Sequence, residues 1–210
     1  MSDPRSEKPK NPSRRRFLAG VGLAGAGAAL AKHAHGFSGK APEGVRELTV
    51  PLVVNGKKRA IKVEARTTLL SALREHLDPP VIGPKQVCEQ GACGACTVLL
   101  DGRPVNSCLV LAADAASARI VTAEGLGTPG HLNPVQAALV EHDGLMCGYC
   151  TPGLVVTLSA LLEKNSNPTL DQVQHACAGN FCRCGTYPRV FESALAAARA
   201  KRGLGGLQGG

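Results

Sequence analysis

At 210 residues, the chain is long enough for one or two domains but too short to hold several cofactor-binding folds. Aromatic residues make up 3% of it and Trp is absent, so its cores must be built from small aliphatic side chains and from whatever its nine cysteines bind. The formal net charge of +8 gives little support for nucleic-acid binding, because six of the 24 Lys and Arg residues, against two of the 16 Asp and Glu residues, fall within residues 1–31.

The N-terminal segment resembles a twin-arginine export leader. Ser13-Arg14-Arg15-Arg16-Phe17-Leu18 precedes residues 19–31, a run rich in Ala and Gly that carries no charge. This run is shorter than the roughly 20 residues that span a bilayer, and Ala29-Leu30-Ala31 is typical of a processing site. The pattern predicts a signal peptide at residues 1–31, a linker at residues 32–46, a periplasmic protein and no stable membrane span. The alternative is an amphipathic or disordered basic tail.

A β-hairpin is predicted where the ordered part of the chain begins. Residues 48–54 alternate as in a strand, and Asn55-Gly56 is the strongest short hairpin signal in the sequence. Residues 58–64 form the second strand, with Ile61 and Val63 on one face. The two strands therefore predict the start of an antiparallel sheet.

An amphipathic helix is predicted at residues 69–77. Thr67 is placed to cap it, and Asp78-Pro79-Pro80 ends it. Four leucines share one face of this helix, so we expect that face to pack on the sheet. They are Leu69, Leu70, Leu73 and Leu77.

A glycine-rich cysteine loop follows the helix. Cys88, Cys93 and Cys96 have the C-x4-C-x2-C spacing of plant-type [2Fe–2S] sites. Three thiolates so close together reach one cluster only if the backbone wraps around it, and Gly91 and Gly94 permit the conformations that this requires. Backbone N–H groups of such a loop can point at the cluster sulfurs. The alternative is a disulfide or zinc framework, although zinc ligands usually come in two separated pairs.

A second hairpin completes the first domain. Residues 97–100 are predicted as a strand, Asp101-Gly102 as the turn, and residues 105–111 as the return strand, which carries Cys108 beside the cysteine loop. These elements form a β-grasp arrangement like that of plant-type ferredoxins. Residues 112–130 read as an interdomain link in which residues 119–121 add one edge strand.

The C-terminal part is predicted to be a small bundle of four helices. Three of the four begin at or near a proline, which is compatible with the first helical turn, and Thr169 and Asp171 suit the start of the third helix. The expected helices cover residues 134–142, 152–163, 170–178 and 188–202. The fold class is therefore α+β, with a ferredoxin-like domain followed by an all-α domain.

Four further cysteines precede two of these helices. Cys147 and Cys150 come before the second helix, and Cys182 and Cys184 come before the fourth. If those two helices begin at the same end of the bundle, the thiolates converge and the helix dipoles stabilise their charge. Cys147 and Cys150 alone could be a redox dithiol or half of a zinc site, but the second pair favours a second cluster. Cys177 is left over as a buried thiol, although its position near Cys182 leaves another ligand assignment open.

The cysteine motifs together resemble the iron–sulfur subunit of molybdenum hydroxylases, the family of xanthine dehydrogenase and aldehyde oxidoreductase. The likeness rests on C-x4-C-x2-C-x11-C, on C-G-Y-C-T-P-G and on G-N-F-C-R-C-G-T-Y, and it runs from about residue 48 to residue 200. It implies a [2Fe–2S] ferredoxin-type domain at residues 47–122 and a helical [2Fe–2S] domain at residues 131–202. It assigns one cluster to Cys88, Cys93, Cys96 and Cys108, and the other to Cys147, Cys150, Cys182 and Cys184.

The resemblance also implies the partners. Substrate is oxidised at a molybdenum–pterin cofactor in a large subunit, and electrons pass through the helical-domain cluster and then the ferredoxin-type cluster to FAD in a medium subunit or to the haem of a cytochrome c. This chain then contributes no catalytic residue. The family usually has Gln where this chain has Met146, and Met cannot donate the corresponding hydrogen bond to the pterin. We expect Met146 to pack at the subunit interface instead.

The long leader favours aldehydes as substrates, oxidised to carboxylates. A subunit of an N-heteroaromatic hydroxylase similar to isoquinoline oxidoreductase and a stand-alone two-cluster ferredoxin are the alternatives.

Overall fold

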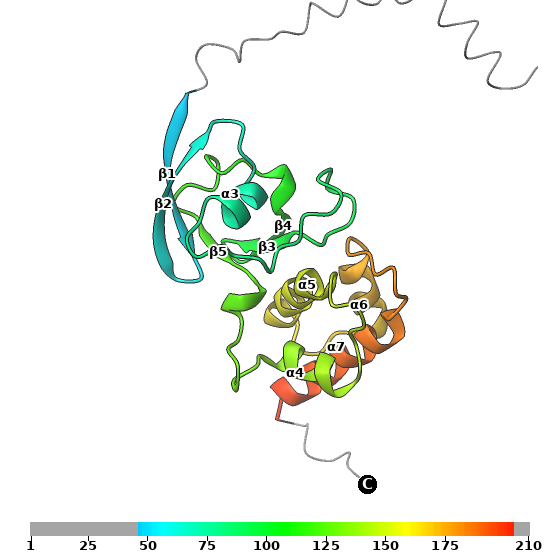
Figure 1. Cartoon of the computed structure of the whole chain (residues 1–210). Helices are drawn as coiled ribbons and strands as arrows, with labels where there is room; N and C mark the ends of the chain where they lie inside the picture. The colour runs from blue at the N-terminus through cyan, green and yellow to red at the C-terminus, as the bar shows by residue number, and fades with distance from the viewer. Residues whose placement is uncertain (1–45, 204–210) are drawn as a thin grey trace, which may run out of the picture. The chain divides into compact units, whose positions relative to one another are not determined.

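The computed structural model describes residues 46–203 (Figure 1). The signal peptide predicted at residues 1–31 lies outside the described residues, as does the linker predicted at residues 32–46 except for Arg46. Residues 46–203 form one folded unit with a sheet in the N-terminal half and helices in the C-terminal half. No helix in this part of the chain has the length and apolar character needed to cross a bilayer.

The N-terminal half contains a mixed sheet of five strands in the order β2-β1-β5-β3-β4. The outer pairs, β1 with β2 and β3 with β4, are the two antiparallel hairpins that the sequence predicts. The strands are β1 (Glu47–Val54), β2 (Lys57–Glu64), β3 (Thr97–Leu100), β4 (Arg103–Asn106) and β5 (Arg119–Val121). The predicted α+β class and ferredoxin-like arrangement are therefore confirmed.

Strand β5 lies in the centre of the sheet, so its prediction as an edge strand is wrong. It pairs in parallel with β1 and antiparallel with β3, and thereby joins the two hairpins. Its middle residue, Ile120, is fully buried. The physical reason is that each hairpin leaves one inner strand with unpaired backbone groups, and β5 supplies partners to both.

Both hairpin turns have the backbone conformation that their sequences predict. Asn55 and Gly56 have φ of 48° and 77°, and Asp101 and Gly102 have φ of 49° and 78°. Two successive residues with positive φ form the type I′ turn, whose twist matches that of the flanking strands.

Helix α3 (Leu69–Glu75) packs Leu69 and Leu73 into the core beside the sheet, whereas its Leu70 packs against Cys96 and Cys108. Its N-cap is Thr68, whose hydroxyl accepts the Ser71 N–H at 3.2 Å, so the assignment of the cap to Thr67 is wrong. The Thr67 backbone is used elsewhere, since its N–H donates to Glu64 and its carbonyl accepts from Ala112. The helix also ends two residues earlier than predicted, although all four predicted core leucines are buried.

The return strand of the second hairpin is shorter than predicted. Strand β4 ends at Asn106, and Cys108 lies in the 3-10 helix η2 (Ser107–Leu109) rather than on a strand. The hydroxyl of Ser107 donates to the Cys96 carbonyl at 2.7 Å. This bond turns the chain at the end of the ladder toward the cysteine loop.

The C-terminal half consists of four helices whose ends all lie within one residue of the predicted ones. Two of them begin with a capping box, formed by Asn133 with Gln136 and by Thr169 with Gln172. A short 3-10 helix, η3 (Ala123–Gly125), joins this half to the sheet. The helices are α4 (Pro134–Glu141), α5 (Thr151–Lys164), α6 (Leu170–Cys177) and α7 (Tyr187–Lys201).

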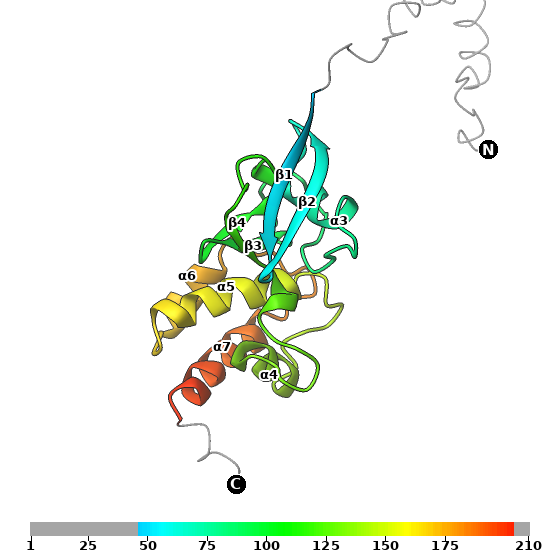
Figure 2. The same ribbon diagram turned by 90° about the vertical axis from the view of Figure 1, so that its left-hand side faces the viewer.

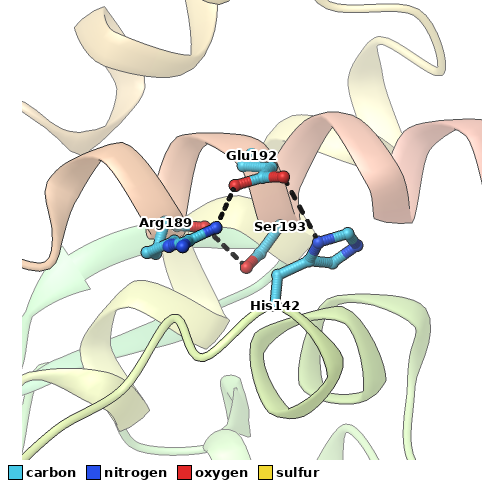
Figure 3. A network of polar contacts seen from close by, with 4 residues as sticks. All are labelled: His142, Arg189, Glu192 and Ser193. Atoms are coloured by element: carbon cyan, nitrogen blue, oxygen red, sulfur yellow. Dashed lines mark hydrogen bonds and ion pairs between the residues drawn. The ribbon is translucent and has the colours of Figure 1, made fainter.

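A polar network joins the end of α4 to the first half of α7 (Figure 3). The Glu192 carboxylate lies 3.1 Å from Arg189 and 3.6 Å from His142, and the Ser193 hydroxyl donates to the Arg189 carbonyl at 2.7 Å. The ion pair between Arg189 and Glu192 is partly exposed, so we expect it to contribute at most about 1 kcal/mol.

The sheet and the helices share a core. Leu99 of β3 packs with Val156 and Ala160 of α5, and α5 lies next to β3 in both views (Figures 1 and 2). The ferredoxin-like half and the helical half are therefore in direct contact.

Candidate metal centres

The four cysteines of the ferredoxin-like half converge. The thiol of Cys88 lies close enough to that of Cys93 for the two to interact, and the thiol of Cys108 interacts with those of Cys96 and Cys88. Cys96 and Cys108 are buried and form a small apolar cluster with Leu70, whereas Cys88 and Cys93 are half-buried. The cysteine loop and η2 thus bring four thiols together, next to Leu70 of helix α3.

The backbone of the cysteine loop points N–H groups at these sulfurs. The Gln90 N–H, followed by the Cys93 thiol, lowers the pKa of Cys88 to about 6. Gly91 also hydrogen-bonds from its backbone to Cys108, although burial and the Cys96 sulfur raise the pKa of Cys108 to about 11. The loop curls in this way because Glu89, Gly91 and Gly94 all have positive φ. It forms a nest of donors suited to anionic sulfur.

The space around Gly91 and Gly94 shows which of the two must be glycine for steric reasons. A Cβ on Gly91 would collide with the exposed Leu109 side chain, which is free to move. A Cβ on Gly94 would collide with the backbone carbonyl of Gly179, which is not. The second glycine therefore permits a close approach between the cysteine loop and the helical half.

The four cysteines of the helical half also converge. The thiol of Cys147 interacts with those of Cys184 and Cys182, and the thiol of Cys150 interacts with those of Cys182 and Cys147. Cys150 is the N-cap of α5, and Cys182 and Cys184 lie in the loop that leads into α7. Two helix starts therefore meet at this site, where their dipoles favour negative charge.

The half-buried thiol of Cys150 and the buried thiol of Cys182 have opposite pKa shifts. Burial and the Cys182 sulfur raise the pKa of Cys150 to about 12. Burial also raises the pKa of Cys182, but hydrogen bonds from the Thr186 hydroxyl and backbone outweigh it and lower that pKa to about 7. The Thr186 oxygen lies 3.1 Å from the Cys182 sulfur.

Both sets offer the donors that an iron–sulfur cluster needs, namely four thiols in reach of one another and backbone N–H groups directed at sulfur. The positive charge of bound iron would offset the burial of Cys108 and Cys150, which otherwise favours their protonated forms. In residues 46–203 no group of three or more His, Cys, Asp or Glu side chains is arranged for a single metal ion. The ligands of a two-iron cluster are divided between two metals and stand further apart than those around one zinc ion.

Cys177 lies elsewhere, in the core of the helical half. It is 2% exposed, and burial alone raises its pKa to about 12. It packs among residues of α4, α5 and α7, including Val135, Leu158 and Val190.

A cavity of about 530 Å³ lies between the two cysteine sets. Cys93 of the first set lines it together with three members of the second set, which are Cys147, Cys150 and Cys182. Phe181 and Tyr149 at this cavity are exposed, as is Met146 beside Cys147, at 73%. Three large apolar side chains near the second set are thus exposed.

Three further residues around the sites have no role in the sequence-based prediction. Thr186 contacts the Cys182 sulfur, and the Tyr187 hydroxyl accepts the Cys182 N–H at 2.8 Å. Asn180 is buried between the two halves. All three fall within G-N-F-C-R-C-G-T-Y, but that motif alone does not say which atoms they contact.

Comparisons with known proteins agree with this geometry. Residues 52–121 match the family model described as 2Fe-2S iron-sulfur cluster binding domain, and residues 122–195 match the one described as [2Fe-2S] binding domain. Two [2Fe–2S] clusters per chain follow from these two matches.

Individual relatives are similar over most of the described chain. The aldehyde oxidoreductase iron-sulfur-binding subunit PaoA of Escherichia coli K12 is 42% identical over 159 residues, which are 69% of this chain and 69% of that protein. The nicotine 6-hydroxylase small subunit of Paenarthrobacter nicotinovorans is 44% identical over 146 residues, 70% of this chain and 87% of that one. A chain in the crystal structure of quinoline 2-oxidoreductase from Pseudomonas putida 86 superposes with a TM-score of 0.69 at 39% identity, covering 75% of this chain and 98% of that one.

Proposed function

Because this chain belongs to the iron–sulfur small subunits of the molybdenum hydroxylase family, we propose that it is the electron-transfer subunit of an exported aldehyde oxidoreductase. Family membership establishes the coarser part, which is a subunit with two [2Fe–2S] clusters that transfers electrons in a complex with a large molybdenum subunit. The observation that carries the proposal is the convergence of two sets of four thiols on either side of one cavity.

The proposed ligands are the eight converging cysteines. Each cluster, when bound, accepts one electron and passes it on. The chain's own residues supply four thiolates to each cluster and direct backbone N–H groups at the sulfurs of the first. The first cluster would be held by Cys88, Cys93, Cys96 and Cys108, and the second by Cys147, Cys150, Cys182 and Cys184.

The apolar surface beside the second set is the proposed docking face for the large subunit. Met146, Tyr149 and Phe181 are each at least half exposed there, and buried apolar anchors are the usual centre of a stable interface. An electron from the large subunit would then enter at the second set and leave from the first, toward FAD in a medium subunit or the haem of a cytochrome c.

Aldehyde oxidation is supported by the relative named as a subunit of an aldehyde oxidoreductase. A second substrate class has equal support from sequence identity, because the nicotine 6-hydroxylase subunit is as similar and acts in a heteroaromatic hydroxylase. The twin-arginine motif at Ser13–Leu18 is the feature that favours the exported aldehyde enzymes.

Purification of the full chain from the organism that encodes it tests this function. We expect it to bring a molybdenum-containing large subunit with it, to hold about four iron atoms per chain, and to give two distinct EPR signals on reduction. Incubation with an aldehyde should reduce both clusters faster than an equal concentration of an N-heteroaromatic compound. A chain that purifies alone without molybdenum would overturn the enzyme-subunit function in favour of a free ferredoxin, and a colourless protein with stoichiometric zinc would overturn both.

A further inference from the structure

We propose that Asn180 is a positioning residue that fixes the distance between the two cysteine sets. This inference rests on the proposed function, because it concerns the passage of one electron from one set to the other. Electron transfer between the sets forms and breaks no covalent bond. Its rate therefore depends on the position of one set relative to the other. Asn180 is 4% exposed and lies two residues before Cys182, with Phe181 between them.

The side chain of Asn180 links three segments. Its Nδ2 donates to the Gly94 carbonyl oxygen at 2.9 Å and lies 3.4 Å from the Thr97 hydroxyl, so it holds the end of the first cysteine loop. Its Oδ1 accepts the hydroxyl of Thr157 at 2.9 Å, so it also holds α5. Donor and acceptor of one buried amide are thus both satisfied, by different halves of the protein.

The backbone around Asn180 completes the link. The Phe181 N–H donates to the Cys93 carbonyl at 2.9 Å. The two cysteine sets are therefore connected through Phe181. Its N–H is hydrogen-bonded to Cys93 of the first set, and Cys182 of the second set follows it in the chain. The Tyr187 hydroxyl accepts the Cys182 N–H and donates to the Asn180 carbonyl at 3.1 Å, so it holds the far end of this route.

The cysteine loop and the helical half are in very close contact at this point. A side chain at Gly94 would collide with Gly179, and a side chain at Gly153 would collide with the Gly94 carbonyl. The backbones of the two halves approach each other here without intervening side chains. Asn180 donates to the Gly94 carbonyl, which is the same group that a Cβ on Gly153 would collide with. A buried amide at such a point defines one geometry, because other placements would leave its polar atoms unpaired.

The test compares variants of the complete complex with its large subunit. Asn180→Leu keeps a similar volume and removes all the side-chain hydrogen bonds. Thr157→Val removes only the bond from α5 and keeps the bond to Gly94. Ser193→Ala removes a buried hydrogen bond inside α7 and serves as the control for a general loss of stability.

Three quantities are measured in each complex: iron content, the magnetic interaction between the two reduced clusters in the EPR spectrum, and the rate at which the ferredoxin-type cluster is reduced after the helical-domain cluster. In Asn180→Leu with full iron content, we expect an altered magnetic interaction and a rate lower by about tenfold, because small displacements of a positioned group have effects of this order or larger. The reduction of the helical-domain cluster by substrate should not change. Thr157→Val should have a smaller effect, and Ser193→Ala none.

An Asn180→Leu complex with full iron content, an unaltered magnetic interaction and an unaltered rate would overturn the proposal. If that variant loses iron, Asn180→Ser replaces it, because the smaller side chain causes no overlap and its hydroxyl is too short to reach Gly94; the same expectation and the same contrary outcome apply. A failure of the proposed function is separate, since it would appear in the unsubstituted complex as missing clusters or missing molybdenum.

Discussion

Gly153, in the first turn of α5, lies directly against the backbone carbonyl of Gly94 in the cysteine loop. A glycine inside a helix is normally unfavourable, because it loses more backbone entropy on folding than alanine does. Here a Cβ would collide with a backbone atom that has no freedom to move away. Gly153 loses backbone entropy on folding, but its missing side chain allows the two halves to pack closely.

Gly153→Ala should therefore destabilise the protein. In an exposed helix the same substitution stabilises by roughly 0.5–1 kcal/mol, whereas the collision with Gly94 should cost about 1–3 kcal/mol. We expect a melting temperature lower by a few degrees in the iron-loaded protein. Gly179→Ala is the matched control, since nothing lies within 4 Å of the added Cβ. An equal or higher melting temperature for Gly153→Ala would contradict the close contact.

Substitution of one proposed ligand should remove one cluster selectively. Cys93→Ser is expected to lower the iron content from about four to about two atoms per chain. Substrate should still reduce the remaining cluster in the complex, but electrons should no longer reach the acceptor. The measurements are iron analysis and EPR after addition of substrate. If Cys93→Ser instead abolishes reduction of the helical-domain cluster, the order of the two clusters in the relay is reversed.

Cys177 should make stability fall at alkaline pH. Burial raises its folded-state pKa to about 12 from the ordinary 9.0. Between these two values the unfolded chain has lost the proton that the folded chain keeps, so the free energy of unfolding decreases as pH rises, by up to about 1.4 kcal/mol per pH unit. Below pH 9 this contribution is fully present.

The measurement is the melting temperature between pH 8 and pH 10.5 for the unsubstituted protein and for Cys177→Val. The melting temperature of the unsubstituted protein should fall more steeply above pH 9. Iron content should be the same in both, because Cys177 lies in the core of the helical half and outside the two proposed ligand sets. Parallel curves would show that the thiol is accessible to water, and a loss of iron in Cys177→Val would make it a ligand.

Met146→Gln should have little effect. The side chain is 73% exposed, so the change in stability should stay within about 0.5 kcal/mol. The rate at which substrate reduces the helical-domain cluster should also be nearly unchanged if Met146 only packs at the subunit interface. A large change in that rate would reveal a specific contact at this position.

Export should depend on the paired arginines. Replacing Arg14 and Arg15 together by Lys keeps the charge, but we expect the protein to remain in the cytoplasm, as cell fractionation with a periplasmic marker would detect. Arg5→Lys, outside the motif, is the control and should be exported normally. Normal export of the double variant would assign residues 1–31 to a basic tail instead.

Local signals in the sequence were sufficient for much of the fold. Asn55-Gly56 specifies its turn by backbone preference alone, and the helices that begin at proline or at a capping box have their ends within one residue of the prediction. The choice of Thr67 instead of Thr68 as a cap failed because adjacent threonines carry the same local signal. A hydrogen bond made by a distant part of the chain, from the Ala112 N–H to the Thr67 carbonyl, helps to distinguish them.

Features that depend on distant segments could not be predicted in this way. The three residues of β5 are too few to show periodicity, and their central place follows from the unpaired backbones of β1 and β3. The spacing of the cysteines, together with the family resemblance, was sufficient to predict the eight proposed ligands. It could not identify Asn180, because its partners lie more than 80 residues earlier, at Gly94 and Thr97, and 23 residues earlier, at Thr157.

The central position of β5 also governs when the protein can fold during synthesis. A nascent chain that ends before Arg119 has both hairpins and all four cysteines of the first set, but it lacks the strand that joins them. Asn180 and Phe181, which hold the first cysteine loop, are made later still. The first site to be translated therefore gains its contacts with the helical half only after residues 180–181 have been made.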